Sequence, residues 1–148
     1  MKMNNSKSFL GHYNHYIVMF FIMILAGLLS TMNTYTNKLD DIRFSLNDLY
    51  MIFQMTGLML LFMGIYYSEM YVIIFGALLS TLSFILIRNQ YFIDETQYLL
   101  GMIPHHSMAV LMSKRLLEKK NNIKDFLENI VNTQFNEINF MKNKLRKT

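Results

Sequence analysis

The sequence contains no cysteine and a single proline, and only 16% of its 148 residues are charged. Without thiols, the chain cannot form disulfides, thiolate zinc sites or a cysteine nucleophile. Its charged fraction lies well below the roughly 25% of ordinary soluble domains. Between Ile17 and Ile87 there are six charged residues, and all of them fall in two short gaps between apolar segments. Such segregation of charge is typical of a membrane protein.

Three apolar segments are long enough to span a bilayer, since a spanning helix needs roughly 20 predominantly apolar residues and at least about 17. Tyrosines gather at their ends, where amphipathic rings favour the membrane interface. Only Ser68-Glu69 separates the second segment from the third, which predicts a tight antiparallel hairpin. A cleaved signal peptide is the alternative for the first segment, but no small-x-small cleavage site follows it. We expect a multi-pass integral membrane protein in contact with the lipid bilayer, with an N-terminal tail over 1–15 and a three-span anchor over 16–88, its spans at about 16–33, 49–67 and 70–87.

The second apolar segment carries a ladder of methionines at Met51, Met55, Met59 and Met63. A spacing of four residues keeps them on one slowly drifting helical face. Thioethers select soft ions, so a ladder of them could pass Cu(I). Methionine is also a flexible apolar filler at helix contacts, and the chain has 14 of them. A metal transporter is therefore the lesser of the functional alternatives.

Beyond the third apolar segment the pattern becomes amphipathic, and residues 92–148 are expected to form a C-terminal helical module. Its first helix should run from about Asp94 to Lys119. Pro104 cannot donate a backbone hydrogen bond to Leu100, so we expect a kink or a restart there.

Asn122 is expected to cap a second helix over 123–146. The predicted fold class is all-α, with three transmembrane helices followed by a two-helix antiparallel hairpin. Two helices of this length bury too small a core to stand alone. The hairpin therefore needs a partner surface, and a homodimer is the simplest way to supply one.

The most informative stretch runs from Gly101 to Met108, because it holds the proline and two of the four histidines beside methionines. In an antiparallel hairpin, Glu137 on the second helix could face His105 or His106. A histidine oriented by a carboxylate is the usual construction of a metal ligand. The same pair would equally satisfy a buried histidine in a polar network without metal. Both interpretations stay open at this point.

Several chemistries lack their required patterns. A di-iron centre of the ferritin type needs Glu-x-x-His on its helices, and that spacing is absent. Hydrolase signatures such as G-x-S-x-G and H-E-x-x-H are absent as well. Ser107 follows His106 directly, and adjacency does not give the geometry of a catalytic pair. The C-terminal basic residues alternate with acidic ones and accompany no base-reading motif, so we expect neither an enzyme nor a nucleic-acid partner.

The hairpin resembles a known family, the domain-of-unknown-function family three hundred and five, across about 94–145. A membrane-anchored bacterial branch is similar also over Asn33-Thr34-Tyr35 and Phe44-Ser45. The chain departs from the family pattern at Ser107-Met108, where Gln-Gly or Gln-Met is commoner. The matching residues are Gly101-Met102-Ile103-Pro104-His105-His106, Ala109-Val110, Met112, Gln134, Glu137-Ile138 and Met141.

This resemblance implies a ferritin-like helical fold and, in some members, copper binding through His and Met. We therefore expect a membrane protein that presents a small His/Met module and binds copper or another transition metal, for sequestration or handover. The alternative is a structural membrane protein whose His pair is a polar core network. The resemblance points to Met102, His105, His106, Met112 and Met141 as ligands, supported by Gln134 and Glu137.

Overall fold

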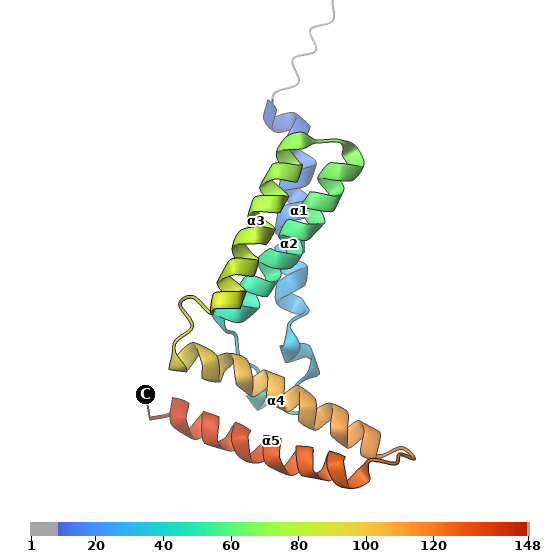
Figure 1. Ribbon diagram of the computed structural model, residues 1–148, viewed down its shortest axis with the longest axis vertical. Helices are drawn as coiled ribbons and strands as arrows, with labels where there is room; N and C mark the ends of the chain where they lie inside the picture. The colour runs from blue at the N-terminus through green and yellow to red at the C-terminus, as the bar shows by residue number, and fades with distance from the viewer. Residues whose placement is uncertain (1–8, 148) are drawn as a thin grey trace, which may run out of the picture. The chain divides into compact units, whose positions relative to one another are not determined.

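The computed structural model describes residues 9–147, and this part of the chain is all-helical, with five α-helices and no strand. Three apolar helices precede two more, as the sequence predicts (Figure 1). Of the expected N-terminal tail, residues 1–8 lie outside the described residues, and the first helix begins at Phe9. The helices are α1 (Phe9–Leu29), α2 (Leu46–Tyr67), α3 (Met70–Asn89), α4 (Glu95–Leu117) and α5 (Lys124–Leu145).

The chain divides into two compact units. The apolar unit comprises Met1–Leu28 and Tyr50–Arg88, and the hairpin unit comprises Leu29–Leu49 and Asn89–Thr148. By length and composition, three helical stretches are long and apolar enough to cross a membrane, and each contains few charged residues. They are Asn14–Tyr35, Leu46–Tyr67 and Met70–Asn89.

Close approach of α2 and α3 organises the apolar unit. A Cβ atom added at Gly76 would lie 2.4 Å from the backbone nitrogen of Leu61, and one at Gly57 would lie 2.6 Å from that of Ser80. Small residues therefore let the two backbones touch, as is common between membrane helices. Beside this contact, Leu60 and Val72 form a buried cluster with Tyr16 of α1.

The turn between α2 and α3 is a Schellman motif built on a residue other than glycine. Ser68 adopts a left-handed conformation with φ of 57°. The Glu69 amide donates to the Gly64 carbonyl at 2.8 Å, and the Ser68 amide donates to Ile65. These two bonds satisfy carbonyls that the helix end would leave without partners, and they explain why two residues are enough for the turn.

In the hairpin unit, α4 begins where the sequence indicates, because the Asp94 side chain accepts a hydrogen bond from the Gln97 amide. The helix does not restart at Pro104 but continues through it to Leu117. The proline ring is fully buried, so its packing offsets the one backbone bond that it removes.

The connection to α5 differs from the prediction. The N-cap position is Ile123 rather than Asn122, and it makes no side-chain cap. Asn121 serves both helices instead. Its amide donates to the carbonyls of Leu116 and Lys119, and its oxygen accepts from the Ile123 amide. One side chain therefore ends α4 and starts the turn into α5.

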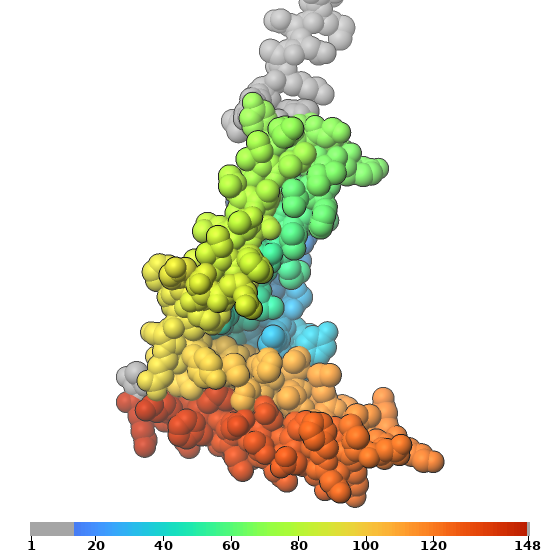
Figure 2. Space-filling model, viewed as in Figure 1, coloured from blue at the N-terminus to red at the C-terminus, as the bar shows by residue number. Residues whose placement is uncertain are grey.

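Helices α4 and α5 lie side by side along their lengths (Figure 2). Apolar residues from both helices form their common core, and Met102, Val131 and Leu145 pack against it. The fully buried core residues include Ile103 and Val110. The complete cluster is Leu99, Ile103, Val110, Ile138 and Met141.

The segment between α1 and α2 belongs to the hairpin unit and contacts α4. It contains two short 3-10 helices, Met32–Tyr35 and Leu39–Asp41. Asn33 closes it into a loop, since its side chain donates to the Arg43 carbonyl and accepts from the Arg43 amide. We call residues 31–45 the clamp loop. It gives α4 a partner surface within the same chain, whereas pairing of two copies stays a prediction.

The clamp loop ends in a capping box at the start of α2. The Ser45 hydroxyl and amide both donate to the Asp48 carboxylate at 2.8 Å. Gln97 of α4 accepts from the Leu46 amide at 2.8 Å and joins the cap to the hairpin. Gly101 permits this contact, because a Cβ atom there would lie 3.1 Å from the Ser45 hydroxyl oxygen.

Candidate functional site

The structure brings His106 of α4 to Glu137 of α5. The His106 Nδ1 atom is buried and lies 3.0 Å from a Glu137 carboxylate oxygen, but it makes no hydrogen bond of standard geometry, and the carboxylate is itself half exposed. The neighbouring His105 is exposed, and its ring centroid lies 5.8 Å from that of His106. The two histidines therefore have different surroundings despite their adjacency in the sequence.

Burial dominates the protonation of His106. It lowers the pKa of the imidazole below the usual value, and the nearby His105 acts in the same direction. The Glu137 carboxylate opposes this shift without overcoming it. His106 is consequently neutral near pH 7, which is the form that binds metal ions.

Two of the predicted methionine ligands lie one helical turn from this contact. Met102 precedes His106 by four residues on α4, and Met141 follows Glu137 by four residues on α5, so each shares a face with its neighbour. Met141 is buried in the hairpin core, and Met102 packs against that core. Met102, His106, Glu137 and Met141 thus occupy two adjacent layers of the hairpin. We call them the His–Met layers.

The other predicted site residues lie elsewhere. Met112 is 60% exposed, two turns beyond His105 on the open face of α4. Gln134 is partly buried on α5. Among the side chains that the structure describes, those of residues 14–147, His, Asp and Glu nowhere gather in a group of three that could hold a metal ion.

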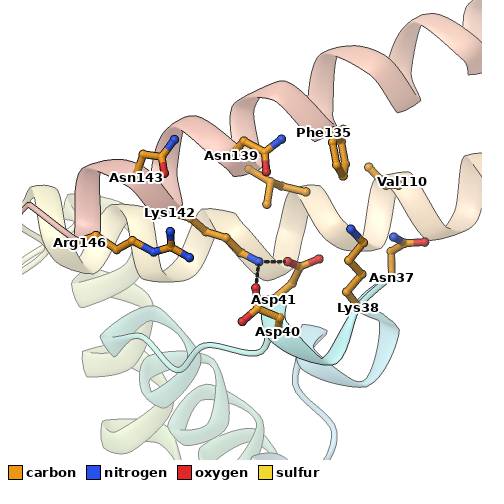
Figure 3. Close-up of a pocket in the computed structure, with 11 residues that line it drawn as sticks. Asn37, Lys38, Asp40, Asp41, Val110, Phe135, Asn139, Lys142, Asn143 and Arg146 are labelled. Atoms are coloured by element: carbon orange, nitrogen blue, oxygen red, sulfur yellow. Dashed lines mark hydrogen bonds and ion pairs between the residues drawn. The ribbon is translucent and has the colours of Figure 1, made fainter.

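A second polar group joins the clamp loop to both helices. Asp41 is 3% exposed and accepts a hydrogen bond of 2.5 Å from the Ser107 hydroxyl of α4. Ser107 is itself fully buried and accepts from the Asn37 amide at 2.8 Å. The Lys142 ammonium of α5 lies 2.5 Å from oxygens of both Asp40 and Asp41 (Figure 3). We call these four residues, Ser107, Asp40, Asp41 and Lys142, the Asp–Lys cluster.

Electrostatic interactions in the Asp–Lys cluster favour the charged forms of Lys142 and Asp40. Burial alone would lower the pKa of Lys142, but the Asp40 and Asp41 carboxylates outweigh burial and raise it. The contact with Lys142 in turn lowers the pKa of Asp40. The Asp41 Oδ1 atom receives no hydrogen bond of standard geometry, so the ion pair with Lys142 is what compensates its burial.

The sequence did not predict the Asp–Lys cluster. In the sequence, Asp40 and Asp41 are charges in a gap between apolar segments, and Ser107 is a departure from the family pattern. The available signal was Lys142, a charged residue beside the apolar stripe of its helix, which needed a buried partner. Nothing in the sequence identified that partner, because Asp41 lies 101 positions away.

The methionine ladder faces outward in the described bundle. Met51, Met55 and Met59 are 44%, 49% and 38% exposed, whereas Met63 packs against the core of the apolar unit. Because three of the four thioethers lie on the outer surface, the ladder does not line an interior passage within one copy of the chain.

Three membrane-length apolar helices followed by a His/Met hairpin define a small helical module with a membrane-type anchor. The family model for "Domain of unknown function" (DUF305) matches residues 90–145, and the chain belongs to this family. An uncharacterized protein of Acanthamoeba polyphaga mimivirus is 42% identical over 132 residues, which cover 84% of this chain and 87% of the relative. No solved structure matches the chain. The family relationship that the sequence suggested is confirmed.

The lowered pKa of His106 predicts a loss of stability on acidification. The unfolded chain, with a histidine pKa near 6.5, binds the proton more readily than the folded one. The free energy of unfolding should therefore be highest above about pH 6.5. It should decrease as the pH falls from there toward the lower pKa of His106 in the folded protein. Thermal unfolding in detergent between pH 7.5 and 5.5 tests this. H106N should flatten the dependence and H105N should keep it; an equally steep dependence in H106N would refute the assignment.

Proposed function

We propose that the chain is an integral membrane protein whose apolar unit anchors a copper-binding hairpin unit. The proposed site lies in the His–Met layers, with His106, Met102 and Met141 as ligands of Cu(I). The role that we assign is binding for sequestration or handover, without bond chemistry. The apolar character and length of the three candidate spans support the anchor.

One observation carries the copper proposal: the contact of 3.0 Å between His106 Nδ1 and the Glu137 carboxylate. A carboxylate this close to one ring nitrogen favours the orientation of the ring that leaves the other nitrogen for a metal ion, and the contact needs only a small adjustment to become a hydrogen bond of standard geometry. Burial keeps that imidazole neutral, which removes the competition from a proton. His106 is therefore prepared for coordination in a way that His105 is not.

The remaining donors select the metal. One imidazole with two thioethers is a soft donor set, and soft sulfur ligands favour Cu(I) over harder divalent ions. Met102 and Met141 come from different helices and lie one turn from the His106–Glu137 contact.

A second candidate function rests on the Asp–Lys cluster. Asp41, Ser107 and Lys142 satisfy one another without any bound ion. If the His106–Glu137 contact has the same purpose, the hairpin is a structural unit that binds no metal. This candidate predicts that the parent protein takes up no copper, and that H106A lowers thermal stability whether or not copper is present.

Adjacent histidines and matched methionines give the copper proposal an internal control. The purified parent protein should bind one Cu(I) per chain in detergent under reducing conditions. H106A should lose about tenfold or more in affinity, and M141L should weaken binding in the same direction, since Leu keeps the volume and removes the sulfur. H105A and M112L remove the same groups from the exposed face and should change the affinity less than twofold.

Competition with a Cu(I)-selective chromophoric chelator measures these affinities, and circular dichroism checks that each variant stays helical. No stoichiometric binding by the parent would favour the structural candidate. Equal losses in H105A and H106A would also contradict the proposed site, because the two side chains differ only in their surroundings.

A further inference from the structure

A small pocket opens between the clamp loop and the last turns of α5 (Figure 3). Its volume is about 180 Å³, well above the roughly 10–15 Å³ that one water molecule requires. Val110 of α4 and Ile138 of α5 contribute its apolar lining, and the other lining residues are mainly polar or charged. None of the four residues of the His–Met layers lines the pocket.

The charges around the pocket do not cancel. Three cations line it, Lys38, Lys142 and Arg146, against two carboxylates, Asp40 and Asp41. Both carboxylates are already engaged by Lys142. The local balance is therefore one net positive charge.

Two cations in the lining have no carboxylate within ion-pair distance among the described residues. The Lys38 ammonium lies 5.0 Å from the centroid of the Phe135 ring, at the side of the pocket. Arg146 affects Asp40 only at longer range, as a charge that lowers the pKa of that carboxyl. Positive charge is thus available to a ligand.

Neutral donors accompany these cations. Asn139 and Asn143 project from successive turns of α5 into the lining, and their side-chain amides make no hydrogen bond to other described residues. Amide NH₂ groups and a guanidinium together offer several donors from one helix. Such donors match an oxyanion with several equivalent oxygens, and arginine is especially suited to a phosphate group.

We infer that this pocket binds a phosphate group, held by Arg146 and Lys38 with the amides of Asn139 and Asn143. The phosphate could belong to a phospholipid headgroup or to a free phosphate ion, and both sources present the same chemistry. The inference does not depend on copper binding, because the two sites share no residue.

Stabilisation of the purified full-length chain in detergent tests the inference. Thermal unfolding is followed while inorganic phosphate is titrated at constant ionic strength against chloride. A parallel titration adds phosphatidylglycerol, with diacylglycerol as the lipid that lacks a phosphate. We expect saturable stabilisation by at least one of the two phosphate compounds and none by chloride or diacylglycerol. Stabilisation by phosphatidylglycerol alone would identify a lipid headgroup, and stabilisation by inorganic phosphate would show that a free ion suffices.

Neighbouring basic residues supply the matched control. R146Q should weaken the apparent affinity by about tenfold or more, because it removes a charged donor from the pocket. K147Q makes the same change of charge one residue later, outside the lining, and should alter the affinity less than twofold. N143A should weaken binding while leaving the net charge unchanged. No saturable stabilisation by either phosphate compound, or equal effects of R146Q and K147Q, would overturn the inference.

Discussion

Replacement of Lys142 by Met should destabilise the hairpin unit by about 3 kcal/mol, as expected when a buried ion pair loses one partner. The Asp41 carboxylate would remain 3% exposed, held only by the Ser107 hydroxyl. Methionine keeps much of the apolar stem of lysine, so lost packing contributes little. Hydrogen exchange of peptides from α4 and α5, in the full-length protein in detergent, measures the change.

The control for this prediction is K144M. Lys144 is half exposed and its partner Glu95 is 72% exposed, so the change should cost no more than about 0.5 kcal/mol. Adding D41N to K142M should recover part of the loss, because the uncompensated charge disappears. If K142M and K144M have the same small effect, the Asp–Lys cluster does not stabilise the hairpin unit.

Alanine at Gly76 should separate α2 from α3 and destabilise the apolar unit by about 1–3 kcal/mol. The added Cβ atom would lie 2.4 Å from the Leu61 nitrogen and 2.8 Å from the Gly57 carbonyl oxygen. Both are backbone atoms, so the clash can be relieved only if one helix moves. Thermal unfolding in detergent and hydrogen exchange in α2 and α3 would report the loss.

A larger change on the same helix serves as the control. L82F adds more volume than a methyl group, but Leu82 is 56% exposed, so its effect should stay within about 0.5 kcal/mol. Unchanged stability in G76A would mean that α2 and α3 do not approach as closely as the structure shows.

Hydrophobic pattern predicted most of the helical architecture. The long apolar runs of α2 and α3 leave few other structures for the chain, and Asp94 marks the start of α4 by an interaction within one turn. The end of α4 and the start of α5 were harder. Asn121 and Asn122 are the same residue type, and only the three-dimensional turn shows that Asn121 makes the bonds.

The clamp loop was beyond sequence reasoning for a different reason. Its contacts join residues far apart in the chain, such as Asn37 with Ser107 and Asp40 with Lys142. Helical periodicity gives no information about irregular segments, so the sequence predicts only a connection between two helices at this position. The His106–Glu137 contact, by contrast, follows from two helical faces and an antiparallel turn.

The clamp loop changes how the hairpin should be regarded. The family match begins at residue 90, yet the structural unit also contains Leu29–Leu49. Ser107, which binds this loop, directly follows His106, so the loop helps to set the position of α4 at the proposed site. An isolated fragment that begins at residue 90 would lack Asp41 and should be less stable than the complete unit.

Copper K-edge X-ray absorption of the Cu(I)-loaded protein tests the central proposal most directly, because it identifies the atoms bound to the metal. The proposal predicts a first shell of one imidazole nitrogen and two sulfurs, with sulfur scattering reduced in M102L and in M141L and unchanged in M112L. A first shell of nitrogen and oxygen alone, or one that is the same in all three variants, would contradict it.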